Sequence, residues 1–84
     1  MRTGDGEPDL PVLVAEAWRD VLRCPAPSHE DNFFELGGHS VAGARVLSRL
    51  QPHLGSRLSM RVLFDHPVFG EFVAAVARLG EARP

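Results

Sequence analysis

Lysine, isoleucine and tyrosine are absent from this sequence, and cysteine occurs once, as Cys24. A single cysteine excludes an internal disulfide and is compatible with a reducing compartment. No apolar run approaches the length of a membrane span, and residues 1–8 are polar, unlike a signal peptide. No coiled-coil seam is present either. We therefore expect a cytoplasmic monomer.

The chain has 84 residues, enough for one small domain but hardly for a deep catalytic cleft. Its formal net charge of −2 argues neither for nucleic-acid binding nor for a polyanionic tail. The charges are unevenly placed, since residues 1–35 carry eight acids and three Arg, whereas residues 41–84 carry three acids and six Arg. The basic half contains either solvated helix faces or a surface that presents Arg to partners.

Apolar residues recur at helical spacing in four segments, and no segment alternates like a strand. We expect helices at residues 9–23, capped by Asp9, and at residues 40–51, ended by Pro52. A short helical turn capped by Ser59 follows at residues 59–64, and a last helix runs from Pro67 to Gly80. The pattern predicts a small all-α bundle over residues 9–80, with tails at residues 1–8 and 81–84.

Residues 24–38 form a long connection between the first two helices, which we expect Phe33, Phe34 and Leu36 to pin to the core. In the second helix, Gly43 shares the apolar stripe of Val46, Leu47 and Leu50. A glycine there predicts the close approach of a neighbouring helix.

The segment DNFFELGGHS, residues 31–40, carries the chemistry. Gly37 and Gly38 allow a sharp turn into a helix, and Ser40 stands at that helix's start. Unpaired N–H groups and the positive end of the helix dipole favour a phosphate there, so Ser40 could accept a phosphodiester-linked group. The alternative is that Ser40 is simply an N-cap. Val41 lies outside the core stripe and suits a docking patch.

Other functions fit less well. The segment from Gly38 to Ala42 nearly matches the nucleophile elbow of hydrolases, but it lacks the preceding strand and the chain is too short for that fold. The four histidines do not have metal-ligand spacing; they are His29, His39, His53 and His66. A helical interaction module without modification stays possible, although plain docking would not require the Gly-Gly-His-Ser turn.

The decamer resembles the core motif of peptidyl carrier (thiolation) domains of nonribosomal peptide synthetases, and residues 14–18, 46–50 and 63–67 resemble other parts of that family. The resemblance implies a four-helix bundle with a short third helix. It implies that Ser40, with Gly38 and His39 beside it, binds 4′-phosphopantetheine, transferred from coenzyme A by a magnesium-dependent phosphopantetheinyl transferase. The chain would be a carrier without catalytic activity or a bound metal of its own.

The same resemblance implies loading by an adenylation enzyme and delivery of an amino acid or related acyl group to condensation, tailoring or thioesterase domains. Docking would use Val41, Ala44, Arg45, Ser48, Met60 and Leu63. Acyl carriers of fatty-acid synthesis are less similar, because His39 precedes Ser40, and Arg45 and Arg49 follow it. An acyl carrier of a polyketide or hybrid pathway is the alternative. Val41, Ala42, Gly43 and Pro52 depart from the family's usual residues, which bears on partner choice. We expect a free-standing carrier rather than a piece of a synthetase.

Overall fold

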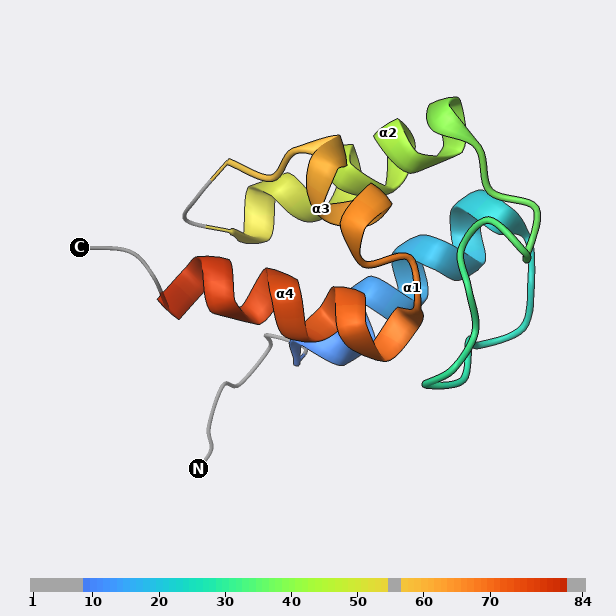
Figure 1. Cartoon of the computed structure of the whole chain (residues 1–84), viewed down its shortest axis with the longest axis horizontal. Helices are drawn as coiled ribbons and strands as arrows, with labels where there is room; N and C mark the ends of the chain where they lie inside the picture. Colours follow the sequence, from blue (N-terminus) through green and yellow to red (C-terminus); the bar gives the residue numbers. More distant parts are fainter. Residues whose placement is uncertain (1–8, 55–56, 82–84) are drawn as a thin grey trace.

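A computed structural model describes residues 9–54 and 57–81, whose regular structure consists of four α-helices and one 3₁₀ turn (Figure 1). The helices are α1 (Leu10–Leu22), α2 (Ser40–Leu50), α3 (Met60–Asp65) and α4 (Phe69–Glu81), and the 3₁₀ turn η1 (Gln51–His53) directly follows α2. The predicted tails lie outside the described residues, except that Glu81 is the last residue of α4.

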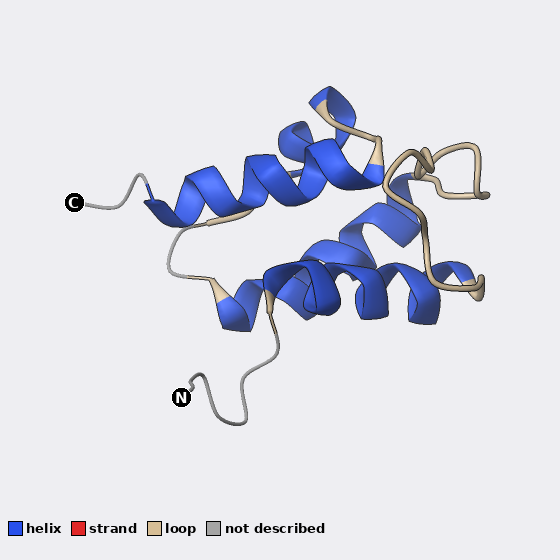
Figure 2. Cartoon of the chain, turned by 90° about the horizontal axis from the view of Figure 1, so that it is seen from below, coloured by secondary structure: helices blue, strands red, loops and turns tan. Residues whose placement is uncertain are grey.

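The helices pack as a bundle in which α1 contacts α2 and α4, and α3 contacts the same two helices. Figure 1 shows α3 between α2 and α4, and Figure 2 shows the long connection gathered at one end of the bundle. The described residues contain no strand, and their one β-bridge is an isolated pair of Asn32 and Val68. The prediction of an all-α four-helix bundle with a short third helix is confirmed.

Trp18 of α1 lies at the centre of the core, with no exposed surface. Its ring meets the edges of two others, at centroid distances of 5.0 Å for Phe33 and 5.2 Å for Phe69. Because a buried aromatic ring removes about 150–250 Å² from water, its burial contributes roughly 4–6 kcal/mol before entropy is counted. The cluster joins α1, the long connection and α4, and so fixes the connection that leads into α2.

The backbone of the connection is tied to the first turn of α4. The N–H groups of Phe69 and Gly70 donate to the carbonyls of Asp31 and His29, at 2.8 and 2.9 Å. The first N–H groups of a helix have no acceptor within the helix. Loop carbonyls here satisfy two of them, so α4 anchors the segment that precedes Ser40.

The helix ends differ slightly from the sequence expectations. The α4 helix begins at Phe69, two residues later than expected, because the carbonyl of Pro67 instead accepts a hydrogen bond from the Phe33 N–H at 2.8 Å. It also continues through Gly80, so this glycine does not close it. Asp9 and Ser59 occupy the expected N-cap positions, but neither side chain makes a capping hydrogen bond.

The chain leaves α2 through a 3₁₀ turn rather than a clean stop. The α2 helix ends at Leu50, and η1 then contains Pro52 at a first-turn position, where its missing N–H group does not matter. The expected end at residue 51 is therefore within one residue of the observed end. The side-chain Oε1 of Gln51 accepts a hydrogen bond from the Leu58 N–H at 2.9 Å. This bond ties the segment that follows η1 to the end of α2.

Candidate functional site

The two glycines before Ser40 serve different purposes. Gly37 has φ +102°, a conformation that L side chains rarely adopt, and a Cβ there would meet nothing within 4 Å. Gly38 is required for space, because a Cβ would overlap the Phe33 ring and lie 2.7 Å from the Phe33 carbonyl oxygen. The Gly38 N–H donates to that same oxygen at 3.0 Å. The turn thus depends on one unusual torsion and one close approach.

His39, not Ser40, is the N-cap of α2. Its extended backbone precedes the helix, and its imidazole Nδ1 accepts the Ala42 N–H at 3.4 Å. Ser40 is the first helical residue, so the alternative interpretation of Ser40 as the N-cap is wrong. The physical reason is that the histidine ring already occupies the capping position, which leaves the serine hydroxyl free of that role.

Ser40 is exposed, and its hydroxyl makes no hydrogen bond within the part of the chain that the structure describes. The backbone N–H groups of Ser40 and Val41 likewise have no acceptor there. Two free N–H donors and the positive helix end suit the negative charge of a phosphodiester. An accessible hydroxyl beside such donors fits a phosphate-linked prosthetic group.

One face of α2 next to Ser40 is open to solvent. Val41 has 60% of its surface exposed, and three further residues of this face are also exposed, namely Ala44, Arg45 and Ser48. These four residues, with Arg49, line a shallow hollow of about 530 Å³. The opposite face of α2 is buried, which confirms the predicted orientation of the helix. We call the face of Val41, Ala44, Arg45 and Ser48 the α2 face.

Residues 12–76 match the protein family described as the phosphopantetheine attachment site. The chain belongs to that family.

The relatives of the chain within this family are nonribosomal peptide synthetases. The chain is 40% identical over 70 residues, 83% of its length, to a linear gramicidin synthase of Brevibacillus parabrevis. It is 43% identical over 70 residues, again 83%, to surfactin synthase subunit 2 of Bacillus subtilis (strain 168). The aligned part covers only 1% and 2% of the length of those two proteins.

Solved structures of carrier domains agree with this. A nonribosomal PCP domain is 30% identical with a TM-score of 0.67, over 81% of this chain and 90% of that one. A peptidyl carrier protein in complex with the phosphopantetheine transferase Sfp and coenzyme A is 28% identical with a TM-score of 0.76, over 84% and 92%. This chain therefore belongs among the peptidyl carrier proteins of nonribosomal peptide biosynthesis, whose prosthetic group is 4′-phosphopantetheine.

Of the two α3 residues that the family resemblance assigned to docking, Leu63 is buried. Leu63 is 0% exposed and belongs to the carrier's core, so it has no surface to offer a partner. Met60 is partly buried and packs against the same core. The exposed apolar residue of α3 is Phe64, with 52% of its surface accessible. The family resemblance assigned Leu63 by its position in the motif pattern, which does not show which side chains of α3 reach solvent in this chain.

Phe34 is a second surface residue that sequence reasoning missed. Phe33 and Leu36 pack into or against the core as expected. Phe34 is 36% exposed, and its ring meets the buried Phe33 ring edge-on at 5.4 Å between centroids, so it contacts the core without being part of it. Its ring also stacks on Phe64 of α3, at 5.8 Å between centroids and 13° between planes. Neither the motif nor the spacing indicates this pairing, because the two residues are far apart in sequence.

Gly43 does allow the predicted close approach. A Cβ at this position would lie 2.9 Å from Met60 Cε and 3.0 Å from Leu63 Cδ2, which places α3 directly over the glycine. These two α3 residues therefore position the short helix beside the α2 face, even though Leu63 cannot take part in docking.

Metal and membrane chemistry find no support in the part of the carrier that the structure describes. No group of three His, Cys, Asp or Glu side chains gathers there as metal ligands would. No helix among residues 9–54 and 57–81 combines the length and apolar character needed to cross a bilayer. Since no strand precedes Ser40 in the described residues, the nucleophile-elbow alternative is excluded by the fold.

Proposed function

We propose that Ser40 is the residue that carries 4′-phosphopantetheine in this chain. The observation that carries the proposal is the exposed Ser40 hydroxyl at the first position of α2, inside the matched family segment. The group would supply a thiol that holds an amino acid or related acyl group as a thioester. The chain itself would supply attachment, presentation and docking.

Other serines fit the role less well. Ser48 lies in the interior of α2, where the backbone N–H groups are used by the helix. Ser28 sits in the connection, and its N–H already donates to an Asp31 carboxylate oxygen at 2.9 Å. Ser59 precedes α3, a helix of six residues. Of the described serines, Ser40 alone combines an exposed hydroxyl with free N–H donors at the start of a long helix.

Gly38 and His39 would act through position rather than through chemistry. Gly38 lets the turn close against Phe33, and His39 caps α2 through its Nδ1 atom. Together they hold Ser40 as the first helical residue and keep its hydroxyl outside the cap. A transferase could then deliver the phosphate without displacing any bond that the hydroxyl makes.

The partners follow from this role. We propose that the chain is modified by a phosphopantetheinyl transferase, loaded by an adenylation enzyme, and read by condensation, tailoring or thioesterase domains. The α2 face and Met60 would form its docking surface. A similar A-PCP structure of McyG, 31% identical with a TM-score of 0.74 over 83% of this chain and 11% of that one, supports adenylation as the loading step. We further propose a non-catalytic, cytoplasmic monomer.

The test is the intact mass of the protein after incubation with coenzyme A, magnesium and a broad-specificity phosphopantetheinyl transferase. The parent and Ser28→Ala should each gain one phosphopantetheine, whereas Ser40→Ala should gain none. Ser28→Ala is the control, because it removes an exposed hydroxyl that lies outside the α2 face. Modification of Ser40→Ala would assign the group elsewhere.

The alternative of an unmodified helical interaction module gives the opposite result. In that case a parent protein with a normal helical circular dichroism spectrum would gain no mass. An acyl carrier of a polyketide pathway would also gain phosphopantetheine. It would differ from a peptidyl carrier in the next step, because adenylation enzymes would not load an amino acid onto its arm.

A further inference from the structure

The α2–α3 side of the molecule has an unusual balance of charge. Between Glu35 and Asp65 the sequence contains no acidic residue, but it contains four arginines, Arg45, Arg49, Arg57 and Arg61. This stretch includes Ser40, all of α2 and most of α3. Any negative charge that neutralises it must therefore come from elsewhere in the chain or from a partner.

Two of the four arginines find such a charge within the chain. Arg49 pairs with Asp20 of α1 at 3.1 Å, and Arg61 pairs with Asp65 at 3.4 Å, four residues later on α3. Arg45 and Arg57 are exposed and have no ion-pair partner among the described residues. The unneutralised positive charge is thus concentrated at these two positions.

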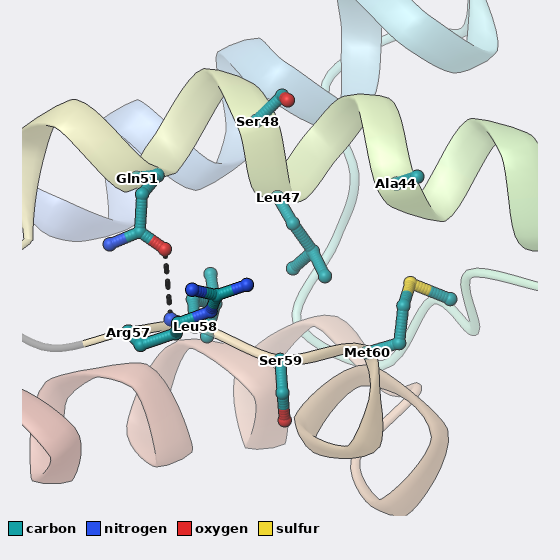
Figure 3. Close-up of a pocket in the computed structure, with 8 residues that line it drawn as sticks. All are labelled: Ala44, Leu47, Ser48, Gln51, Arg57, Leu58, Ser59 and Met60. Carbon is teal, nitrogen blue, oxygen red and sulfur yellow. Dashed lines mark hydrogen bonds between the residues drawn. The ribbon is translucent and has the colours of Figure 1, made fainter.

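Arg45 belongs to the α2 face, and Arg57 lies beside that face. Ala44 and Ser48 line the shallow hollow that contains Arg45, and they also line a larger groove of about 690 Å³ that contains Arg57. They therefore form a ridge with one free guanidinium on each side. Figure 3 shows the second side, where Arg57 faces α2 across the groove, beside the hydrogen bond between Gln51 and Leu58.

An enzyme that binds around the Ser40 hydroxyl must also contact Arg45. It lies about 7.5 Å from Ser40 along the helix axis, and it is the i+4 neighbour of exposed Val41. Enzymes that act on cargo can meet the far end of a flexible arm. The transferase, in contrast, must bring its donor to Ser40, and a standard interface of about 800 Å² per partner would cover Arg45 as well.

We propose that Arg45, supported by Arg57, docks the phosphopantetheinyl transferase by contacting carboxylates on that enzyme's surface. The proposal rests on the proposed modification of Ser40. A partner surface without acidic groups would leave Arg45 desolvated and unpaired, which is costly. Opposite charges instead speed encounter and set orientation. The positive α2 face thereby selects a transferase with an acidic docking surface.

The experiment is steady-state kinetics of phosphopantetheine transfer by a broad-specificity transferase, varying the carrier at saturating coenzyme A and, in a second series, coenzyme A at saturating carrier. Arg45→Glu should raise the KM for the carrier about tenfold, with kcat within about twofold, because a like charge then faces the enzyme. Arg45→Lys should keep most of the affinity, and Arg57→Glu should show a smaller rise. Raising the salt from about 50 to about 300 mM should weaken the parent and leave Arg45→Glu nearly unchanged.

Arg19→Glu is the matched control. Arg19 is exposed, has no ion-pair partner among the described residues, and lies about 140° around α1 from buried Val14. Arg19→Glu makes the same charge change outside the α2 face, so the KM of the transferase for this variant should equal the KM for the parent. Circular dichroism checks that each variant folds, and Arg45→Gln provides a milder change.

The outcomes separate the docking role of Arg45 from the proposed modification of Ser40. A parent that is never modified overturns the proposed function. A modified parent with equal KM values for Arg45→Glu and Arg19→Glu overturns only the docking role of Arg45. A rise in the KM for coenzyme A, with an unchanged KM for the carrier, would also overturn it, since Arg45 would then contact the phosphates of the donor.

Discussion

The ring of Phe34 stacks on the ring of Phe64 across the surface of the molecule, with 5.8 Å between their centroids. Phe34 belongs to the connection that leads to Ser40, and Phe64 belongs to α3. The pair therefore joins two segments that both border the candidate site. Because each ring is partly exposed, the contact sits outside the core that holds the bundle together.

A double-mutant cycle on this pair should reveal a modest coupling. Phe34→Ala and Phe64→Ala should each destabilise the protein slightly, and their coupling energy should be about 0.5–1.5 kcal/mol, the usual value for an aromatic pair. Urea unfolding followed by Trp18 fluorescence measures it. Phe33→Ala is the contrast, expected to cost about 3–5 kcal/mol because its ring is fully buried. Strictly additive single changes would show that the two rings do not interact in solution.

Alanine at the two site glycines should destabilise the protein for different reasons. Gly38→Ala should cost about 1–3 kcal/mol through overlap with the Phe33 ring, and Phe33→Leu should relieve part of that cost. Gly37→Ala should cost about 1 kcal/mol through its positive φ, and the same leucine should give no relief. Denaturant unfolding of the single and double variants tests both points. Equal relief in both backgrounds would contradict the assignment.

Gly43→Ala sets helix propensity against the approach of α3. Alanine is favoured over glycine in a helix by about 1 kcal/mol, but its Cβ would crowd Met60 and Leu63. We expect a neutral or destabilised single variant. In a Met60→Ala background two of the three nearest atoms are gone and Leu63 Cδ2 remains, so the same change should be more favourable there than in the parent, by up to about 1 kcal/mol. Thermal unfolding decides, and stabilisation in both backgrounds would mean that α3 does not press on Gly43.

Val41→Asp should separate docking from folding. Val41 is 60% exposed, so a carboxylate there should change the free energy of unfolding by less than about 0.5 kcal/mol. The same change puts a negative charge on an apolar part of the α2 face and should lower phosphopantetheine transfer about tenfold. Val12, 46% exposed on α1, provides the matched control as Val12→Asp. Similar transfer rates for the two variants would remove Val41 from the interface.

The sequence anticipated those features that depend on local chemistry. Helical spacing located all four helices to within about two residues, because an amphipathic stripe reflects which face each helix buries. The motif residues, Gly37 to Ser40, located the turn and the exposed serine. Gly43 indicated a close neighbour without naming it. The helix caps were less accurate, since Asp9 and Ser59 sit at cap positions without making the bonds that their residue types favour.

Pairings between distant residues could not be foreseen. Whether Phe34 or Leu63 reaches solvent depends on how the connection and α3 lie against the other helices, and no spacing rule covers a six-residue helix or an irregular loop. The same holds for the charges. Sequence showed a basic half, but it could not show that Arg49 reaches Asp20, 29 residues earlier, while Arg45 reaches nothing in the described residues.

The sequence by itself thus determined the helical bundle, the glycine turn and the serine at the start of α2, because each follows from the torsions and burial preferences of a few neighbouring residues. Tertiary structure decided which aromatic residues face solvent and which arginines remain unpaired. These outcomes depend on packing between segments that are distant along the chain, where one contact excludes another only after the whole bundle has formed.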